Sequence, residues 1–304
     1  MTIAAHTEPT IIHVTPAFEG SNIRAWIGFK HFLYLVERAV LQWLLDQGHG
    51  ARELYRDHGL GVEIVDCSAL FSAALELDED VRAEIAARPD GRLTVRLTVL
   101  RQGRQVTALR ATVSVALIQE RTAEVHRPAP PALAHLEAAE LSDACAAAGP
   151  GRTAEAPGWA EPGGFRWSWR IPYFYCHYSD RMQHSGFVRA LEEAFDRFLA
   201  DRGISIARLL RERSWIPVVS RTRIQLIAPA YMEETLHTVF RVTGVMRGIM
   251  FDARMDCYVQ RGPDLVHVAT AQILHGYMMS AGESAGAPVQ LGPDMVEALT
   301  GGSA

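Results

Sequence analysis

Lysine, clustered positive charge and long apolar runs are all scarce in this sequence of 304 residues. Arginine carries nearly all of the positive charge, a bias typical of a GC-rich genome. The net charge of −5 argues against nucleic acid as a partner, because phosphate binding needs clustered lysine and arginine. No stretch approaches 18 uninterrupted apolar residues, so we expect no membrane span.

The N-terminus and the cysteines indicate a cytoplasmic protein. Residues 1–15 lack a basic segment followed by an apolar run, so no signal peptide is expected. Four cysteines are present without CxxC spacing: Cys67, Cys145, Cys176 and Cys257. This pattern favours reduced, mostly buried thiols over a disulfide or zinc framework. No motif in the sequence predicts a cofactor.

An internal repeat is the strongest signal in the chain. Residues 32–48, FLYLVERAVLQWLLDQG, align at an offset of 155 with residues 187–203, FVRALEEAFDRFLADRG. Six of the 17 pairs are identical, namely Phe32/Phe187, Glu37/Glu192, Ala39/Ala194, Leu44/Leu199, Asp46/Asp201 and Gly48/Gly203. The sequence therefore predicts two copies of one module.

Each repeated segment is predicted to be one long helix. Apolar residues recur at helical spacing on one face, in the first copy at Phe32, Leu35, Val36, Ala39, Val40 and Trp43. The second copy repeats the pattern at Phe187, Ala190, Leu191, Ala194, Phe195 and Phe198. Gly48 and Gly203 follow at the position where a glycine commonly ends a helix.

One strand before each helix and four after it are predicted from alternating and β-branched runs. In the first copy these strands are 11–17, one from residue 60, then 81–87, 93–101 and 106–118. In the second copy they are 169–176, one from residue 216 at an offset of 156, then 236–245, 249–260 and 265–277. Their hairpin-like spacing favours an antiparallel sheet and an α+β fold class.

The expected domain organisation is a first module at 1–120, an Ala/Pro-rich linker at 121–164, a second module at 165–280 and a flexible tail at 281–304. The linker is interpreted as a surface crossing. Residues 133–148 within it could form a short helix. The aromatic-rich stretch 165–178 is interpreted as a core strand in preference to a ligand platform.

A long helix followed by a wrapping antiparallel sheet resembles the hot-dog fold. Such modules pair side by side, so that two sheets become one and an edge strand is covered. Two copies in one chain imply a double hot-dog, an intramolecular pseudo-dimer. Assembly of several chains into a homo-oligomer stays open.

The loop before the first helix resembles the motif of the thioesterases of enediyne polyketide pathways and of the broader 4-hydroxybenzoyl-CoA thioesterase-like group. Eight residues of 18–39 match its pattern without a gap: Glu19, Ser21, Asn22, Phe32, Leu33, Glu37, Arg38 and Ala39. Asn22 takes the position of the usual aspartate. Asparagine cannot be a base, but it can orient water or donate a hydrogen bond to the thioester; alternatively, Asn22 only shapes the turn.

The loop before the second helix, residues 175–194, resembles the D-x-x-G-V-V-x-H-x-N-Y-L-x-x-x-E-x-A motif of the same group. His177 falls on the acid position, His184 on the motif histidine and Gly186 on the asparagine. Either His177 is a general base with Asp180 beside it, or the usual carboxylate chemistry has been lost. The same residues could also be ordinary polar loop residues.

Further candidates follow from the resemblance. Glu37 and Glu192 share one helical position, where a structural and a catalytic carboxylate are equally plausible. Glu19, Ser21 and Gly186 are candidate substrate-binding residues. Backbone N–H groups near Gly28 or Gln183 are expected to hold an oxyanion, because a helix start offers unpaired N–H groups. No ligand spacing supports a metal site, and no GxSxG elbow is present.

The resemblance implies a thioesterase that hydrolyses an acyl-CoA or acyl-carrier-protein thioester. One alternative with the same fold is a dehydratase or hydratase of 3-hydroxyacyl or enoyl thioesters, which needs a histidine base and an acid. Another is a binding protein that holds an acyl thioester without turnover. The first loop has no Asp at the acid position and the second has no Asn, so the residues in which they differ are where function is expected.

Overall fold

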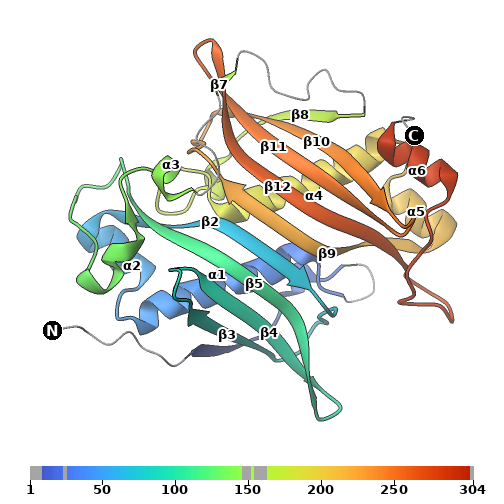
Figure 1. Ribbon diagram of the computed structural model, residues 1–304, viewed down its shortest axis with the longest axis horizontal. Helices are drawn as coiled ribbons and strands as arrows, with labels where there is room; N and C mark the ends of the chain where they lie inside the picture. The colour runs from blue at the N-terminus through green and yellow to red at the C-terminus, as the bar shows by residue number, and fades with distance from the viewer. Residues whose placement is uncertain (1–8, 23–25, 146–151, 154–162, 302–304) are drawn as a thin grey trace.

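One twisted antiparallel sheet carries both long helices on the same face. The computed structural model describes residues 9–22, 26–145, 152–153 and 163–301. Helix α1 (Phe29–Asp46) lies behind the strands of the first half, and helix α4 (His184–Asp201) behind those of the second (Figure 1). This arrangement confirms the predicted α+β double hot-dog fold.

The sheet is continuous across the two modules. The first module supplies β1 (Thr10–Val14), β2 (Leu60–Phe71), β3 (Val81–Ala87), β4 (Leu93–Arg101) and β5 (Arg104–Gln119). The second supplies β8 (Phe165–Arg170), β9 (Trp215–Leu226), β10 (Thr235–Met246), β11 (Met250–Arg261) and β12 (Asp264–Met279). The spatial order is β1-β3-β4-β5-β2-β9-β12-β11-β10-β8, so β2 and β9 join the halves. The two-residue strands β6 (Glu137–Ala138) and β7 (Arg152–Thr153) pair with β5 and β12.

Apolar faces of both helices form the core against the sheet. The predicted faces are buried, with Ala39, Val40, Ala194 and Phe198 completely inaccessible. The two helices also meet each other, where Arg189 Nε of α4 donates a 2.6 Å hydrogen bond to the Tyr34 hydroxyl of α1. Both glycine stops have positive φ, as predicted for helix ends.

The repeat extends through the backbone hydrogen bonds of both loops. Gly28 N–H donates to Gly20 O in the first copy, and Gln183 N–H donates to Tyr175 O in the second. The bridges Ser21–Ile27 and Cys176–Met182 correspond in the same way. Strand β9 follows β2 at an offset of 155, so the predicted offset of 156 was wrong by one residue.

The strand predicted at 169–176 is wrong in its position. Strand β8 ends at Arg170 and residues Tyr173–Tyr175 form the 3₁₀ helix η4, just as Phe18–Gly20 form η1 after β1. The stretch 165–178 is therefore not a core strand: β8 is an edge strand, and Tyr173, Phe174 and Tyr178 are exposed. Aromatic and β-branched residues favour strands wherever they occur, so the pattern could not separate β8 from the turn that follows it.

The linker and the tail are more ordered than the sequence predicted. The linker contains a 3₁₀ helix η3 (Pro131–Leu136) and helix α3 (Leu141–Ala144), with Leu133 and Leu141 buried. In the tail, which was predicted to be flexible, α6 (Pro293–Thr300) buries Met295 and Leu299. Short helices α2 (Ala51–Glu53) and η2 (Leu54–His58) in the first module correspond to α5 (Ile206–Arg213) in the second. The module limits at residues 120 and 165 stay a prediction.

Among the glycines, Gly59 is the one whose substitution the fold tolerates least. It links η2 to β2 with φ +74°, and a methyl group there would lie 1.8 Å from the backbone oxygen of Val125 in the linker. Gly91, at φ +80°, has open space around it.

We predict that Gly59→Ala destabilises the protein more than Gly91→Ala does. Both substitutions carry a backbone cost of about 1 kcal/mol for positive φ. Only Gly59→Ala adds overpacking, which costs about 1–3 kcal/mol. Urea unfolding of the two variants measures the difference, and equal losses would contradict the close approach of the linker.

Candidate functional site

A large cavity lies between the first loop and helix α4. Its volume is about 1310 Å³, and residues of both modules line it. Four of the sequence-predicted residues are in its wall: Glu19, Asn22 and Gly28 from the first loop, and Glu192 from α4. Strands β9 and β12 of the second module form much of the remaining wall. One module thus supplies the loop and the other supplies the helix glutamate.

The first loop is closed tightly against the start of α1. Asn22 N–H donates to Trp26 O at 2.6 Å, and Gly28 N–H donates to Gly20 O at 2.9 Å. A methyl group at Gly28 would lie 3.3 Å from the side-chain amide of Asn22, so glycine lets that amide reach the helix start. Because the Gly28 N–H is already bonded, the N–H groups available to a ligand are those of Phe29 and Lys30, which have no partner within the helix.

Lys30 and Glu192 connect the two modules at the cavity. Lys30 is the only lysine in the chain, and its Nζ lies 2.6 Å from Glu192 Oε2. Both residues line the cavity. This ion pair fixes the Glu192 carboxylate beside the N-terminus of α1, which the sequence did not indicate because lysine scarcity was interpreted as compositional bias.

His31 is a further wall residue that the sequence interpretation missed. Its side chain is buried, it lines the cavity, and its Nε2 has no hydrogen-bond partner among the described residues. A methyl group at Gly20 would lie 2.7 Å from the His31 ring. Burial, followed by the charge of Lys30, lowers the pKa of His31. The imidazole is therefore neutral at pH 7. Its position in the first turn of α1 was the available signal.

The second loop has the same backbone geometry but different contents. Gln183 N–H is bonded to Tyr175 O, so it too is not a free donor. His177 is exposed, and its Nε2 lies 3.4 Å from the Ser185 hydroxyl. Glu37 of α1 lies next to the second loop, just as Glu192 of α4 lies next to the first loop. Burial raises the pKa of Glu37 to about 7. The cavity wall does not include His177, Gln183 or Glu37.

A buried ion network occupies the region behind the second loop. Arg181 donates to Glu63 at 2.9 Å and to Glu120, and Gln183 also donates to Glu63 at 3.0 Å. At an offset of 155, Arg181 corresponds to Trp26 and Glu63 to Val218, both of which line the cavity. In the second site, charged side chains therefore occupy the positions that line the cavity in the first site.

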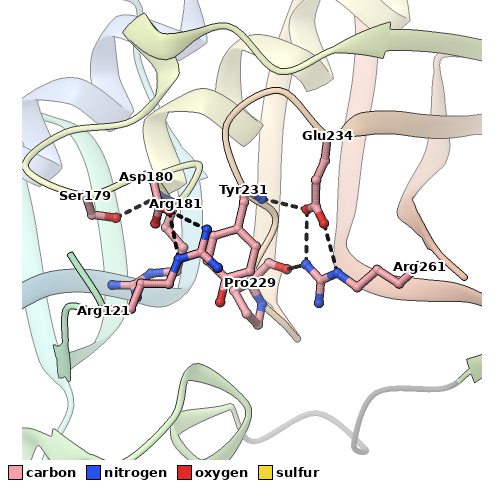
Figure 2. A network of polar contacts seen from close by, with 8 residues as sticks. All are labelled: Arg121, Ser179, Asp180, Arg181, Pro229, Tyr231, Glu234 and Arg261. Carbon is pink, nitrogen blue, oxygen red and sulfur yellow. Dashed lines mark hydrogen bonds and ion pairs between the residues drawn. The ribbon is translucent and has the colours of Figure 1, made fainter.

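Asp180 is part of a structural cluster at the outer side of this loop (Figure 2). Its carboxylate is ion-paired with Arg121, whose guanidinium lies 3.6 Å from the ring centroid of Tyr231. Beside it, Arg261 donates to Glu234 and to the backbone oxygen of Pro229 (Figure 2). In the first module, Arg101 likewise donates to Glu79 and to the backbone oxygen of Ala74. We call this arrangement of an arginine, a glutamate and a backbone oxygen the turn clamp. Because both modules have it, its role is structural.

The remaining candidates are packed into the protein. His184 is 3% exposed, and burial lowers its pKa to about 4. Gly186 is buried against Met182 and Tyr175. Ser21 is next to the cavity wall, and its hydroxyl has no partner among the described residues. Within the part of the chain that the structure describes, no three His, Cys, Asp or Glu residues are grouped to hold a metal ion, and no helix is long and apolar enough to cross a membrane.

Comparison with known proteins supports the fold across both modules. The 12:0-ACP thioesterase from Umbellularia californica superposes with a TM-score of 0.60 at 9% identity, covering 87% of this chain and 93% of that one. An acyl-ACP thioesterase from Bacteroides thetaiotaomicron superposes with a TM-score of 0.54 at 10% identity, covering 88% and 97%. No curated protein sequence matches the chain.

The protein has a double hot-dog fold, because its two modules share one sheet and the loop of each module faces the helix of the other. Residues 174–299 match the family model of the thioesterase-like superfamily. The second module is therefore similar to that superfamily, as the motif resemblance implied.

We predict that Glu120→Gln makes the protein more stable at pH 8 and leaves its stability unchanged near pH 4. Burial raises the pKa of Glu120 to about 7, above its ordinary value of 4.5. The stability provided by the protonated carboxyl is thus fully present below about pH 4.5 and is lost as the pH rises through 7. Glutamine stays neutral throughout, so the gain over wild type should grow across this window.

Urea unfolding between pH 4 and pH 8 measures this gain, and Glu124→Gln at an exposed neighbouring position is the control. A gain that does not depend on pH would show that folding does not raise the pKa of Glu120.

Proposed function

We propose that this chain hydrolyses acyl thioesters of coenzyme A or of an acyl carrier protein in the cavity behind the first loop. The observation that carries the proposal is the convergence of Asn22, the N-terminus of α1 and Glu192 on one cavity. The names of the two-module structural relatives describe acyl-ACP thioesterases, which supports the same reaction class.

The wall residues supply each group that thioester hydrolysis requires. The N–H groups of Phe29 and Lys30 and the positive end of the α1 dipole stabilise the carbonyl oxygen as it becomes an oxyanion. The Asn22 amide donates to the thioester or holds the attacking water. Glu192, positioned by Lys30, accepts the proton of that water. The C–S bond then breaks, and the leaving thiolate takes the proton from Glu192.

The first-loop site is proposed as the working one, and the second loop as structural. Asp180 is ion-paired with Arg121, His184 is in the core, and the space behind His177 is occupied by the Arg181 network. A hydratase would need a histidine base and an acid together in the cavity, and the second-loop histidines predicted for that role do not line it. Because His31 and Glu192 do line it, an assay of water addition to an enoyl thioester separates a hydratase from a thioesterase.

The four cysteines are all free thiols, which supports the proposed cytoplasmic location. Whether acyl groups arrive on coenzyme A or on a carrier protein is left to assays with both donors, and sedimentation would establish the oligomeric state.

We predict that Asn22→Ala lowers kcat for acyl-CoA hydrolysis by about 10²–10³-fold, the usual loss for one oxyanion or water-orienting donor. His177→Ala is the matched control, because His177 takes the same position in the other loop, and it should leave kcat within about threefold. A larger loss in His177→Ala would move the working site to the second loop.

We predict a similar contrast between the two helix glutamates. Glu192→Gln removes the proposed base and should lower kcat by about 10²–10⁴-fold, whereas Glu37→Gln should retain activity. Steady-state hydrolysis of one acyl-CoA by both variants checks this. Wild-type activity in both variants would mean that neither helix glutamate acts as the base, and an equal loss in both would contradict the assignment to Glu192 alone.

A further inference from the structure

The wall of the cavity formed by β9 and β12 contains polar groups without partners. Tyr277 on β12 is 1% exposed, and its hydroxyl makes no hydrogen bond to any described residue. The hydroxyl of Ser220 on β9 is buried and equally unpartnered. Both residues line the cavity, and both belong to the second module, whereas the Asn22 loop belongs to the first.

His275 lies next to this pair. It is 1% exposed and lines the cavity, and its ring stacks on Phe195 with centroids 3.8 Å apart. A backbone hydrogen bond with Val218 acts on the ring, but its geometry is too poor to satisfy either ring nitrogen fully. Burial lowers the pKa of His275 to about 3. The neutral ring therefore presents one donor and one acceptor.

The repeat shows that the scaffold does not require these polar residues. Strand pairing aligns His275 with Val115, because the pairs Val219–His275 and Ile64–Val115 correspond. By the same register Tyr277 corresponds to Leu117, and Ser220 corresponds to Val65 at the bulge of β2. All three counterparts are buried apolar residues. The same fold position is thus apolar in one module and polar in the other.

Buried polar groups without partners destabilise a protein, so such groups on a cavity wall are suited to a ligand or an ordered water that satisfies them. Around them, Ile216, Val218, Ile249 and Met250 provide an apolar wall along the cavity. The chemistry suited to such a site is a mainly hydrocarbon group that carries one hydrogen-bonding oxygen.

We propose that the β9–β12 wall binds an oxygen function, hydroxyl or carbonyl, on the acyl group, so that the substrate is an oxygenated acyl thioester in preference to a plain alkyl one. This inference rests on the proposed function, because it places the acyl group of the thioester in the cavity. The Tyr277 hydroxyl donates to the oxygen, and Ser220 and His275 supply the further donor and acceptor. Hydrocarbon on either side of the oxygen contacts the aliphatic wall.

Hydrolysis of matched substrates tests the proposal. The substrates are dodecanoyl-CoA and a series of hydroxydodecanoyl-CoA and oxododecanoyl-CoA thioesters with the oxygen at successive carbons. The wild-type protein should prefer the best oxygenated substrate over dodecanoyl-CoA by at least about tenfold in kcat/KM, since a site built to bind a hydroxyl discriminates strongly against its absence. Tyr277→Phe should lose about tenfold on that substrate and stay within about twofold on dodecanoyl-CoA.

Two controls separate recognition from folding. Tyr258→Phe removes the hydroxyl of another buried tyrosine that does not line the cavity, and it should leave the preference unchanged. Tyr277→Phe should melt at the same temperature as the wild type or higher, because it deletes a polar group that has no partner in the free protein. Unchanged selectivity in Tyr277→Phe would overturn the proposal and would fit a buried water as the partner of these groups.

Binding of the free acids by calorimetry distinguishes this proposal from the proposed function. If no thioester is hydrolysed but the hydroxy acid binds at least about tenfold more tightly than dodecanoic acid, and Tyr277→Phe abolishes that difference, the function fails and the oxygen site stands. If dodecanoyl and oxygenated thioesters are hydrolysed equally well by both proteins, the function stands and the oxygen site is refuted. Equal binding of the two acids by the wild type refutes it as well.

Discussion

The antiparallel pairing of β2 with β9 is the constraint on which the rest of the molecule depends. Its central pair is Ser68 with Arg223, two positions 155 residues apart, so the repeat axis passes through this pair. An ion pair of 2.6 Å between Arg223 and Asp66 reinforces the register. Because the pairing relates the modules by an approximate two-fold rotation, each loop faces the helix of the other module. Glu192 therefore lies behind the first loop and Glu37 behind the second, although each is remote in sequence from the loop that it serves.

The frame is symmetric, and its contents are not. Equivalent loops have equivalent backbone hydrogen bonds, equivalent bridges and equivalent turn clamps. Side chains then divide the two sites: Trp26 and Val218 border a cavity, whereas Arg181 and Glu63 form a buried ion pair. Removing one partner of such a pair would leave an uncompensated buried charge, which costs about 3–5 kcal/mol. The second site is thus committed to its structural role by the energetic cost of taking its network apart.

Residue identities at an offset of 155 were enough to predict the repeat. The local spacing of apolar residues then predicted both long helices and the antiparallel sheet. The site was only partly predictable. Asn22, Gly28 and Glu192 were identified, yet the preference for His177, Asp180 and His184 came from their alignment with a motif and from residue type. Burial of His184 and the pairing of Asp180 with Arg121 depend on contacts with distant segments, which spacing does not encode. Lys30 could have been noticed as the single exception to an arginine bias, and His31 as a second polar residue in the first turn of the same helix.

In both modules, some inward positions hold a polar residue where the corresponding residue of the other module is apolar. Whether that polar residue has a hydrogen-bond partner separates a structural role from a ligand-binding role. Glu63 occupies the position that corresponds to Val218 in the other module. Arg181 and Gln183 donate hydrogen bonds to one of its carboxylate oxygens. Tyr277 occupies the position that corresponds to Leu117 in the first module, and its hydroxyl has no hydrogen-bond partner among the described residues. Since an unsatisfied buried hydroxyl only destabilises the free protein, its position on a cavity wall is informative in a way that the position of Glu63, which is ion-paired with Arg181, is not. Comparison of one repeat with the other therefore distinguishes polar residues that hold the fold together from polar residues that await a ligand.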